Sequence, residues 1–232
     1  MLGRRRKVPV IGQLPRPSGG ADPGTLRRGE LQAYGSVLSE LDGQGVVLVT
    51  GEPASKCSVS IAIATVASAA GRRVALVECD LANPSLAASL ELAPAPGLHE
   101  YLRWDVEAAQ ILQALVLTGP GSGSAAEPLV CVVAGEPTSS GSVLLSAESF
   151  RHAVERLRSA YELVVLCAPS LEEAPLVELV AERSDVALAA IDRPAASGRR
   201  GRRLKRAMRR LPIPRVGLVL HADPAQEPPV PA

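Results

Sequence analysis

The sequence predicts an α/β protein whose core is a doubly wound, mostly parallel sheet. Short, continuous apolar runs of strand length alternate with helical segments along most of the chain. Such runs are typical of strands that are buried on both faces of a parallel sheet. The length of 232 residues suits one large domain with a real core. Only five residues are aromatic, so that core must consist mainly of Ala, Val, Leu and Ile.

The chain divides into three parts by composition. Residues 1–30 are rich in Arg, Pro and Gly and are predicted to form a basic lead-in, residues 31–222 the α/β domain, and residues 223–232 a loose tail. Within the domain, strands are predicted at 46–50, 74–79, 129–134, 163–167, 186–191 and 216–220, and helices at 31–41, 58–70, 147–159, 171–182 and 197–211. Right-handed crossovers would place the loops after the strands along one edge of the sheet, where functional residues are expected.

Composition excludes several classes of protein. The formal net charge of +1 gives no attraction of the whole protein to nucleic acid, and no nucleic-acid partner is expected. No signal-peptide pattern and no apolar run of membrane-spanning length is present, which predicts a cytoplasmic protein. The four cysteines are too widely spaced for a zinc knuckle and are expected to be reduced.

The loop after the first apolar strand has the parts of a phosphate-binding loop. The segment GEPASKCS, residues 51–58, brings a glycine, small residues and a lysine between a strand and a helix. Backbone N–H groups and a helix N-terminus hold phosphate oxygens in such loops, and the lysine neutralises charge. The loop is short, however, and Ser55 stands where the motif has glycine. Cys57 stands where the motif has a hydroxyl for Mg²⁺, although Ser58 follows. A working loop and a merely structural turn both remain open on these residues alone.

Seven segments in the same order resemble the bacterial tyrosine kinase (BY-kinase) domain of capsule and exopolysaccharide export, a relative of the MinD/ParA P-loop ATPases. They are KVPVIGQLPRP (7–17), VVLVTGEPASKCS (46–58), RRVALVECDLANPSL (72–86), PGLHEYL (96–102), VAGEPTSSGSVLLSAESF (133–150), YELVVLCAP (161–169) and VGLVLH (216–221). The resemblance implies a P-loop NTPase fold, with ATP and Mg²⁺ as cofactors and their loss left open.

The resemblance also implies which residues form the site. Gly51, Ser55, Lys56, Cys57 and Ser58 would surround the nucleotide. Glu78 and Asp80 would stand at the catalytic positions, with Ser58 and Asp80 holding Mg²⁺.

Several positions depart from the family pattern. Cys167 replaces the aspartate that ends the Walker B strand, Glu78 replaces the first aspartate of the second Walker motif, and no tyrosine follows Tyr161. Because phosphoryl transfer depends on Mg²⁺ and on placed charge, these changes predict a degenerate pseudo-kinase.

The resemblance places the chain in polysaccharide export, as a regulator that contacts a membrane chain-length determinant (polysaccharide co-polymerase) at the inner face of the membrane. Two alternatives stay open: an active ATP-dependent tyrosine autokinase, and a MinD/ParA-like positioning ATPase. Self-association is also left open.

The three cysteines near the predicted site and the basic helix near the end of the chain each have a functional and a purely structural interpretation. Cys57, Cys79 and Cys167 would lie at one crevice edge, either as a soft-metal or oxidant-sensing thiol cluster or as filler of the space that a nucleotide no longer takes. The basic helix Arg199 to Arg210 is either a solvated surface or a contact with anionic lipid or an acidic partner.

Overall fold

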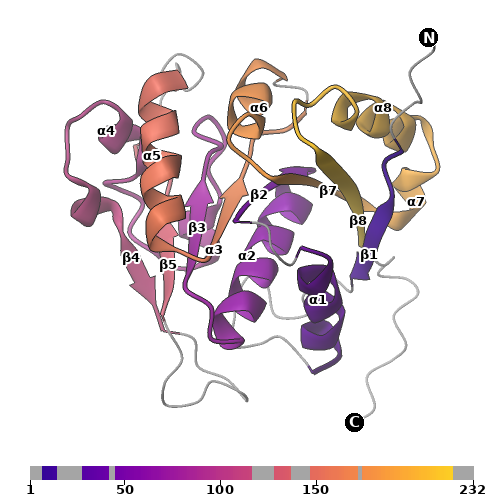
Figure 1. Ribbon diagram of the computed structural model, residues 1–232, viewed down its shortest axis with the longest axis horizontal. Helices are drawn as coiled ribbons and strands as arrows, with labels where there is room; N and C mark the ends of the chain where they lie inside the picture. The colour runs from indigo at the N-terminus through magenta and orange to yellow at the C-terminus, as the bar shows by residue number, and fades with distance from the viewer. Residues whose placement is uncertain are drawn as a thin grey trace.

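The computed structural model describes residues 7–14, 28–41, 45–116, 128–136, 147–171 and 174–221. Its centre is an eight-stranded sheet with helices on both faces (Figure 1). The strands are β1 (Val10–Leu14), β2 (Val46–Gly51), β3 (Val74–Glu78), β4 (Gln113–Leu115), β5 (Leu129–Val132), β6 (Leu163–Cys167), β7 (Val186–Asp192) and β8 (Arg215–His221). The helices are α1 (Arg28–Glu40), α2 (Pro53–Ala69), α3 (Leu86–Ser89), α4 (Leu98–Leu102), the 3₁₀ turn η2 (Ala108–Ile111), α5 (Ala147–Ala160), α6 (Ala174–Ala181), α7 (Arg193–Ala196) and α8 (Arg199–Met208).

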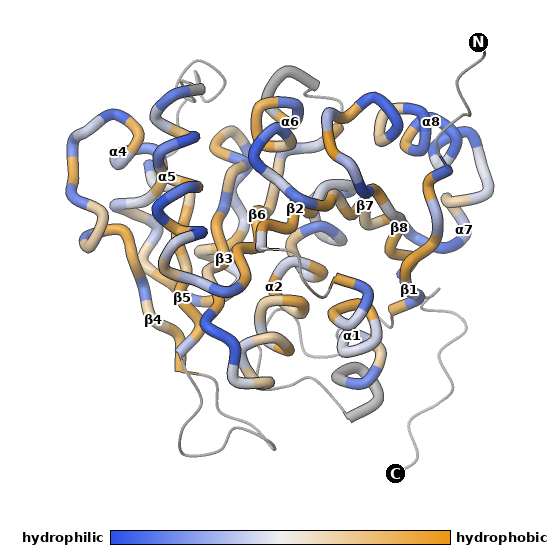
Figure 2. Tube along the Cα trace, in the orientation of Figure 1, coloured by the Kyte–Doolittle hydropathy of each residue, from blue (hydrophilic) through white to orange (hydrophobic). Residues whose placement is uncertain are grey.

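The strand order is β1-β8-β7-β2-β6-β3-β5-β4, and all neighbours run parallel except β4, which is antiparallel to β5. The predicted doubly wound, mostly parallel α/β fold is therefore confirmed. The inner strands are buried along their whole length, and Figure 2 shows them as a hydrophobic band through the middle of the molecule. This explains why they appear in the sequence as unbroken apolar runs rather than as alternating patterns.

Two apolar layers cover the faces of the sheet. On one face, α1 and α2 contribute Tyr34, Val37, Val59 and Ile63 to the core. On the other, α4, α5, α6 and α8 contribute Leu98, Phe150, Val177 and Met208. Within the described segments, no helix has both the length and the apolar character needed to cross a bilayer.

Three differences from the sequence-based prediction matter for the site. The sheet extends into the predicted lead-in, because β1 pairs with β8 at the edge of the sheet. The predicted helix at 197–211 corresponds to α8, and the short helix α7, which was not predicted, precedes it. Most importantly, α2 begins at Pro53, five residues before the predicted start at Ser58. Proline at the first helical position has a backbone already suited to a helix start, and this signal was not used in the prediction. The predicted tail, residues 223–232, lies outside the described residues.

Candidate functional site

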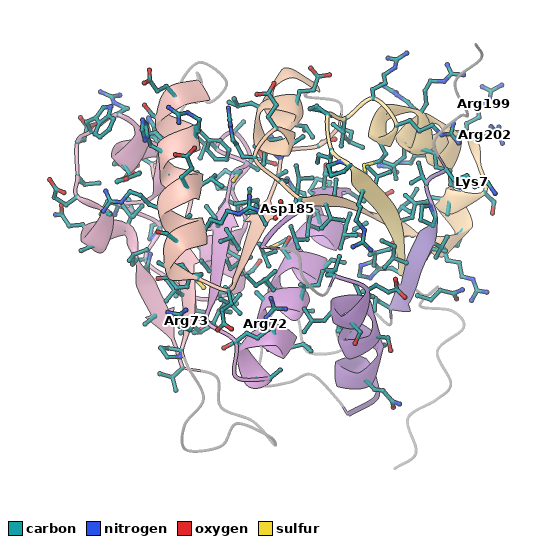
Figure 3. All side chains as sticks on the ribbon, viewed as in Figure 1. Lys7, Arg72, Arg73, Asp185, Arg199 and Arg202 are labelled. Atoms are coloured by element: carbon teal, nitrogen blue, oxygen red, sulfur yellow. The ribbon has the colours of Figure 1, made fainter. Side chains whose placement is uncertain are left out.

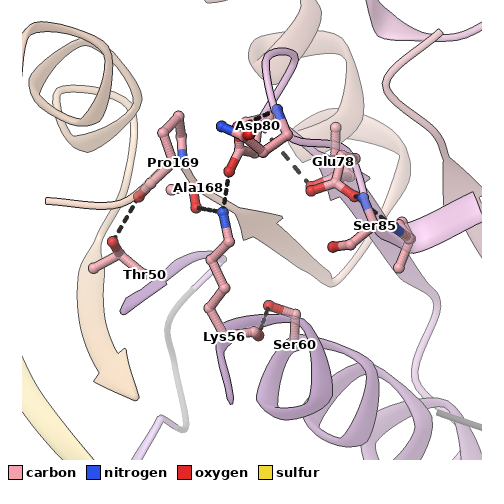
Figure 4. A network of polar contacts seen from close by, with 12 residues as sticks. Thr50, Lys56, Ser60, Glu78, Asp80, Ser85, Ala168 and Pro169 are labelled. Carbon is pink, nitrogen blue, oxygen red and sulfur yellow. Dashed lines mark hydrogen bonds and ion pairs between the residues drawn. The ribbon is translucent and has the colours of Figure 1, made fainter. Parts of the chain in front are cut away.

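The candidate site lies where β2, β3 and β6 end, at the carboxyl edge of the sheet. In the strand register Cys167 is the partner of both Val49 on β2 and Glu78 on β3. The helix α2 follows β2 directly, so its first turns face the ends of β3 and β6 (Figure 4). The topology thus gathers the residues that the sequence analysis selected from segments more than one hundred positions apart.

The connection from β2 to α2 is a single residue, Glu52. Glu52 is the N-cap of the helix, Pro53 follows it, and the backbone N–H of Lys56 donates to the carbonyl of Glu52 over 2.8 Å. Ser55, Lys56, Cys57 and Ser58 are therefore all helical residues, with their backbone N–H groups inside the first turns of α2. A cradle for phosphate needs several consecutive N–H groups turned outwards from a loop, and this connection is too short to provide one.

Gly51 serves packing at this connection. Its φ is +135°, and a Cβ at this position would lie 2.1 Å from the carbonyl oxygen of Ala190 on β7. Only glycine permits this backbone conformation together with such a close approach of two strands. The glycine that the sequence analysis assigned to a phosphate loop is thus required by the sheet itself.

Lys56 is fully buried and its ammonium is directed inwards. It forms an ion pair with the carboxylate of Asp80 and donates a hydrogen bond to the carbonyl of Ala168 over 2.9 Å (Figure 4). Burial alone would lower the pKa of Lys56, yet its pKa is raised, because Cys167, Asp80 and Glu78 stabilise the charged form. The positive charge that a phosphate loop would offer to its ligand is neutralised within the protein.

Both carboxylate oxygens of Asp80 also have partners within the protein. One carboxylate oxygen contacts Lys56, and the other accepts the backbone N–H of Asn83 over 3.0 Å. Its side chain is only 3% exposed.

Glu78 faces away from the lysine, towards the turn that precedes α3. Its Oε2 accepts the backbone N–H groups of Ser85 (2.9 Å) and Leu86 (2.6 Å), and its Oε1 is buried without a hydrogen-bond partner. Burial raises the pKa of Glu78 to about 7, against the lowering effect of those two hydrogen bonds. The protonated form could use Oε1 as a donor, whereas Mg²⁺ requires an ionised and accessible oxygen.

The thiols of Cys57 and Cys167 interact with each other, whereas the thiol of Cys79 contacts a backbone carbonyl instead. A hydrogen bond with the Cys167 thiol lowers the pKa of Cys57 to about 6, and Cys57 Sγ lies 3.5 Å from Ser89 Oγ. Burial raises the pKa of Cys79, whose Sγ lies 4.0 Å from the carbonyl of Val77. No group of three or more potential metal ligands occurs within the described ranges, so these thiols do not assemble the soft-metal cluster weighed above.

Taken together, the residues do not fit a magnesium nucleotide. Two positions where the family pattern has a hydroxyl and an aspartate are thiols here, Cys57 and Cys167, both almost fully buried. The implied ligand Asp80 is paired with Lys56. Mg²⁺ prefers oxygen and keeps strict octahedral geometry, which sulfur does not offer. Ser58 is partly buried on the second turn of α2 and is the remaining hydroxyl of the implied set.

A hollow of about 290 Å³ opens beside this site, between the start of α2 and α8. Gly51, Glu52 and Pro53 line one side, and Arg200 and Arg203 line the other. Arg200 and Glu52 form an ion pair of 3.0 Å there. The glutamate places negative charge at the helix N-terminus, which is the end that would otherwise favour an anion.

No protein-family model and no curated protein matches the sequence. Solved structures do. The kinase domain of Escherichia coli tyrosine kinase ETK is similar with a TM-score of 0.76 and 16% identity, over 97% of this chain and 95% of that one. The tyrosine kinase domain of BceF gives a TM-score of 0.74 and 16% identity, over 94% of each chain. The chain has the fold of a bacterial tyrosine kinase domain.

The wider P-loop group is also similar. The septum site-determining protein MinD from Pyrococcus horikoshii, solved with Mg-ADP, gives a TM-score of 0.56 and 17% identity, over 80% of this chain and 74% of that one. The predicted resemblance to BY-kinases and their MinD-like relatives is confirmed at the level of the fold.

The sequence indicated Lys56, Glu78 and Asp80 as site residues, but the ion pair between Lys56 and Asp80 was not predicted. The inward ion pair depends on how far α2 lies from the end of β3, and no local pattern encodes that distance. The carbonyl of Ala168 and the pair Glu52–Arg200 were also missed. The Glu52-Pro53 dipeptide was the one available signal, because it marks a helix start within the supposed loop.

Proposed function

We propose that this protein is a pseudo-kinase of the BY-kinase fold, which acts in polysaccharide export by contact with a membrane chain-length determinant protein rather than by phosphoryl transfer. The observation that carries the proposal is the buried ion pair of Lys56 with Asp80, next to a connection of one residue in place of a phosphate loop. Binding of ATP would have to break that pair and unwind the first turn of α2. Breaking the buried pair alone would cost several kcal/mol before any contact with phosphate is gained.

The tyrosines give separate support. The chain has three, and none of them is fully exposed: Tyr34 is buried, and Tyr101 and Tyr161 are half-buried. An autokinase needs an accessible phenol as its phosphate acceptor, and none of these three side chains is an exposed one. The role in export and the membrane partner rest on the similarity in fold to kinase domains of that family and on the segments quoted above.

The test has two arms. In the first, the purified chain is incubated with Mg²⁺ and γ-labelled ATP beside a Lys56→Arg variant, which keeps the charge. No label above the variant is expected, and labelling of the chain or of a tyrosine peptide would favour the active autokinase instead. In the second, the chain is mixed with the cytoplasmic segment of the chain-length protein from the same organism. Binding without nucleotide is expected, and failure to bind would remove the proposed regulatory role.

A further inference from the structure

The positive charge of this protein is concentrated in one short segment. Residues 193–215 contain nine arginines and one lysine, and none of the chain's 24 acidic residues. The rest of the chain therefore carries 15 basic residues against those 24 acidic ones. The net charge near zero therefore results from a basic segment and an acidic remainder that balance each other. Two arginines of the segment, Arg200 and Arg203, line the hollow beside the candidate site.

The helix α8 presents this charge to solvent. Six arginines on the helix and the turn after it have exposed side chains in addition to Arg200: Arg199, Arg202, Arg203, Arg206, Arg209 and Arg210. Gly201 and Met208 form the buried side, and a Cβ on Gly201 would lie 2.0 Å from the carbonyl oxygen of Ala196. This close packing of α8 on α7 fixes the orientation of the helix, so the arginine face cannot turn inwards. Figure 2 shows α8 as a largely hydrophilic element at one end of the molecule.

The start of the chain adds to the same surface. The strand β1 pairs with β8, and the N–H of Leu218 donates to the carbonyl of Pro9 over 2.8 Å. Lys7 is thereby held at this edge of the sheet, and Figure 3 shows it at the same end of the molecule as Arg199 and Arg202. Three more arginines, residues 4–6, precede Lys7 in the sequence.

Among the described residues, Glu52 and Glu178 bring carboxylates to α8, against seven arginines on that helix and the turn after it. Glu52 pairs with Arg200. Glu178 of α6 lines a hollow of about 450 Å³ together with Arg203, Arg206 and Arg210. The remaining field is strongly positive, and such a field attracts an anionic surface over about a Debye length.

We propose that the α8 face, defined as Lys7 with Arg199, Arg202, Arg203, Arg206, Arg209 and Arg210, docks directly on an anionic lipid bilayer. The segment 193–215 has no aromatic residue to stack on a base and no Asn or Gln to read a base edge. It also lacks the aromatic anchors that are enriched in protein interfaces. Long cationic side chains alone suit a fluid layer of anionic headgroups, which needs charge density and no fixed geometry. Because Leu204 and Met208 are turned towards the core, the contact is with headgroups and involves no insertion.

The proposal does not depend on the pseudo-kinase site, and vesicle binding tests it without nucleotide. The full chain is sedimented with vesicles of phosphatidylglycerol and phosphatidylcholine, and with vesicles of phosphatidylcholine alone. Binding is expected only to the anionic vesicles and is expected to weaken as salt is raised. The triple variant Arg199→Gln/Arg202→Gln/Arg206→Gln should bind roughly 100-fold more weakly, as expected for three charges close to the surface.

A matched variant, Arg72→Gln/Arg73→Gln/Arg103→Gln, loses the same charge away from α8 and should bind like the wild type. Equal losses in the two variants, or no binding of the wild type to anionic vesicles, would overturn the proposal. Tighter binding to duplex DNA or to polyglutamate at the same salt concentration would also overturn it.

The only tryptophan of the chain gives an independent test of orientation. Trp104 follows α4, near the β4 end of the sheet, and is 74% exposed. Its emission should stay that of a water-exposed indole while the protein is bound to vesicles. A blue shift on binding would place the α4 end on the lipid and contradict docking through α8.

Discussion

The ammonium of Lys56 and the carboxylate of Asp80 form an ion pair in which the two side chains are only 1% and 3% exposed. The carbonyl of Ala168 takes a second hydrogen bond from the lysine, and the N–H of Asn83 satisfies the other oxygen of Asp80. Every strong partner of the pair is therefore part of the fold, and the lysine acts as a structural element that joins α2 to the ends of β3 and β6.

Replacement of Lys56 should therefore destabilise the fold. Lys56→Met leaves Asp80 buried without its counter-charge, and we expect the free energy of unfolding to fall by about 3–5 kcal/mol. Urea denaturation followed by circular dichroism measures this change. Lys205→Met on α8, where the side chain is half-buried, serves as the matched control and should change stability by less than about 0.5 kcal/mol.

The double variant Lys56→Met/Asp80→Asn separates the pair from simple packing. It removes both charges but keeps an amide oxygen for the N–H of Asn83, so it should recover a large part of the lost stability. If the single variant Lys56→Met is as stable as Lys205→Met, the ion pair of Lys56 with Asp80 does not stabilise the fold.

Glu78 should make stability fall with rising pH. Its pKa is raised to about 7 in the folded protein by burial, above the ordinary value of 4.5. The folded state therefore holds its proton more tightly than the unfolded state, and this group costs stability as pH rises from about 4.5 through 7. The loss is roughly 3 kcal/mol at most. Glu78→Gln should flatten the pH profile of unfolding in this window and be more stable than the wild type at pH 8, and an unchanged profile would contradict the assignment.

Cys57 should be the first of the four thiols to ionise. Its pKa is lowered to about 6 by the hydrogen bond with Cys167, whereas burial raises the pKa of Cys131 to about 12. Thiolate absorbance of the native protein should therefore show one transition near pH 6. Cys167→Ala should move that transition upwards, while Cys131→Ala should leave it in place. A midpoint that does not respond to Cys167→Ala would show that the two thiols do not interact.

We expect that Gly51 tolerates no side chain, because the neighbouring strand β7 leaves no room for a Cβ. This effect on stability should not depend on nucleotide. Gly51→Ala forces a Cβ against the carbonyl of Ala190 at a positive φ and should cost more than about 2 kcal/mol. Gly35→Ala in α1, where a Cβ meets nothing within 4 Å, should instead stabilise by about 0.5–1 kcal/mol. Thermal unfolding of the two variants gives the comparison, and similar shifts for both would contradict the structural role of Gly51.

Much of the fold could be predicted because buried parallel strands have a strong local signature. Unbroken runs such as Val46–Gly51 and Leu163–Cys167 are apolar on both sides, and few other structures produce that pattern. The strand β1 was missed, because Val10–Leu14 is a partly exposed edge strand between prolines and lacks an apolar run.

The candidate site was predicted only as a set of residues. Lys56, Glu78 and Asp80 could be selected because the loops after parallel strands share one edge. Which carboxylate the lysine contacts depends on distances between α2 and β3, and these are set by tertiary packing. The prediction of a phosphate loop failed because α2 begins at Pro53, so residues expected in the loop belong to the helix.

The central claim is that a structural ion pair has replaced the nucleotide site, and calorimetry tests it most directly. The purified chain is titrated with ATP and with ADP, each with and without Mg²⁺, beside the Lys56→Arg variant whose fold is checked by circular dichroism. We predict no binding heat for either nucleotide in the micromolar range, and the same result for the variant. Magnesium-dependent micromolar binding that is lost in Lys56→Arg would contradict the account and show that the lysine leaves Asp80 to hold phosphate.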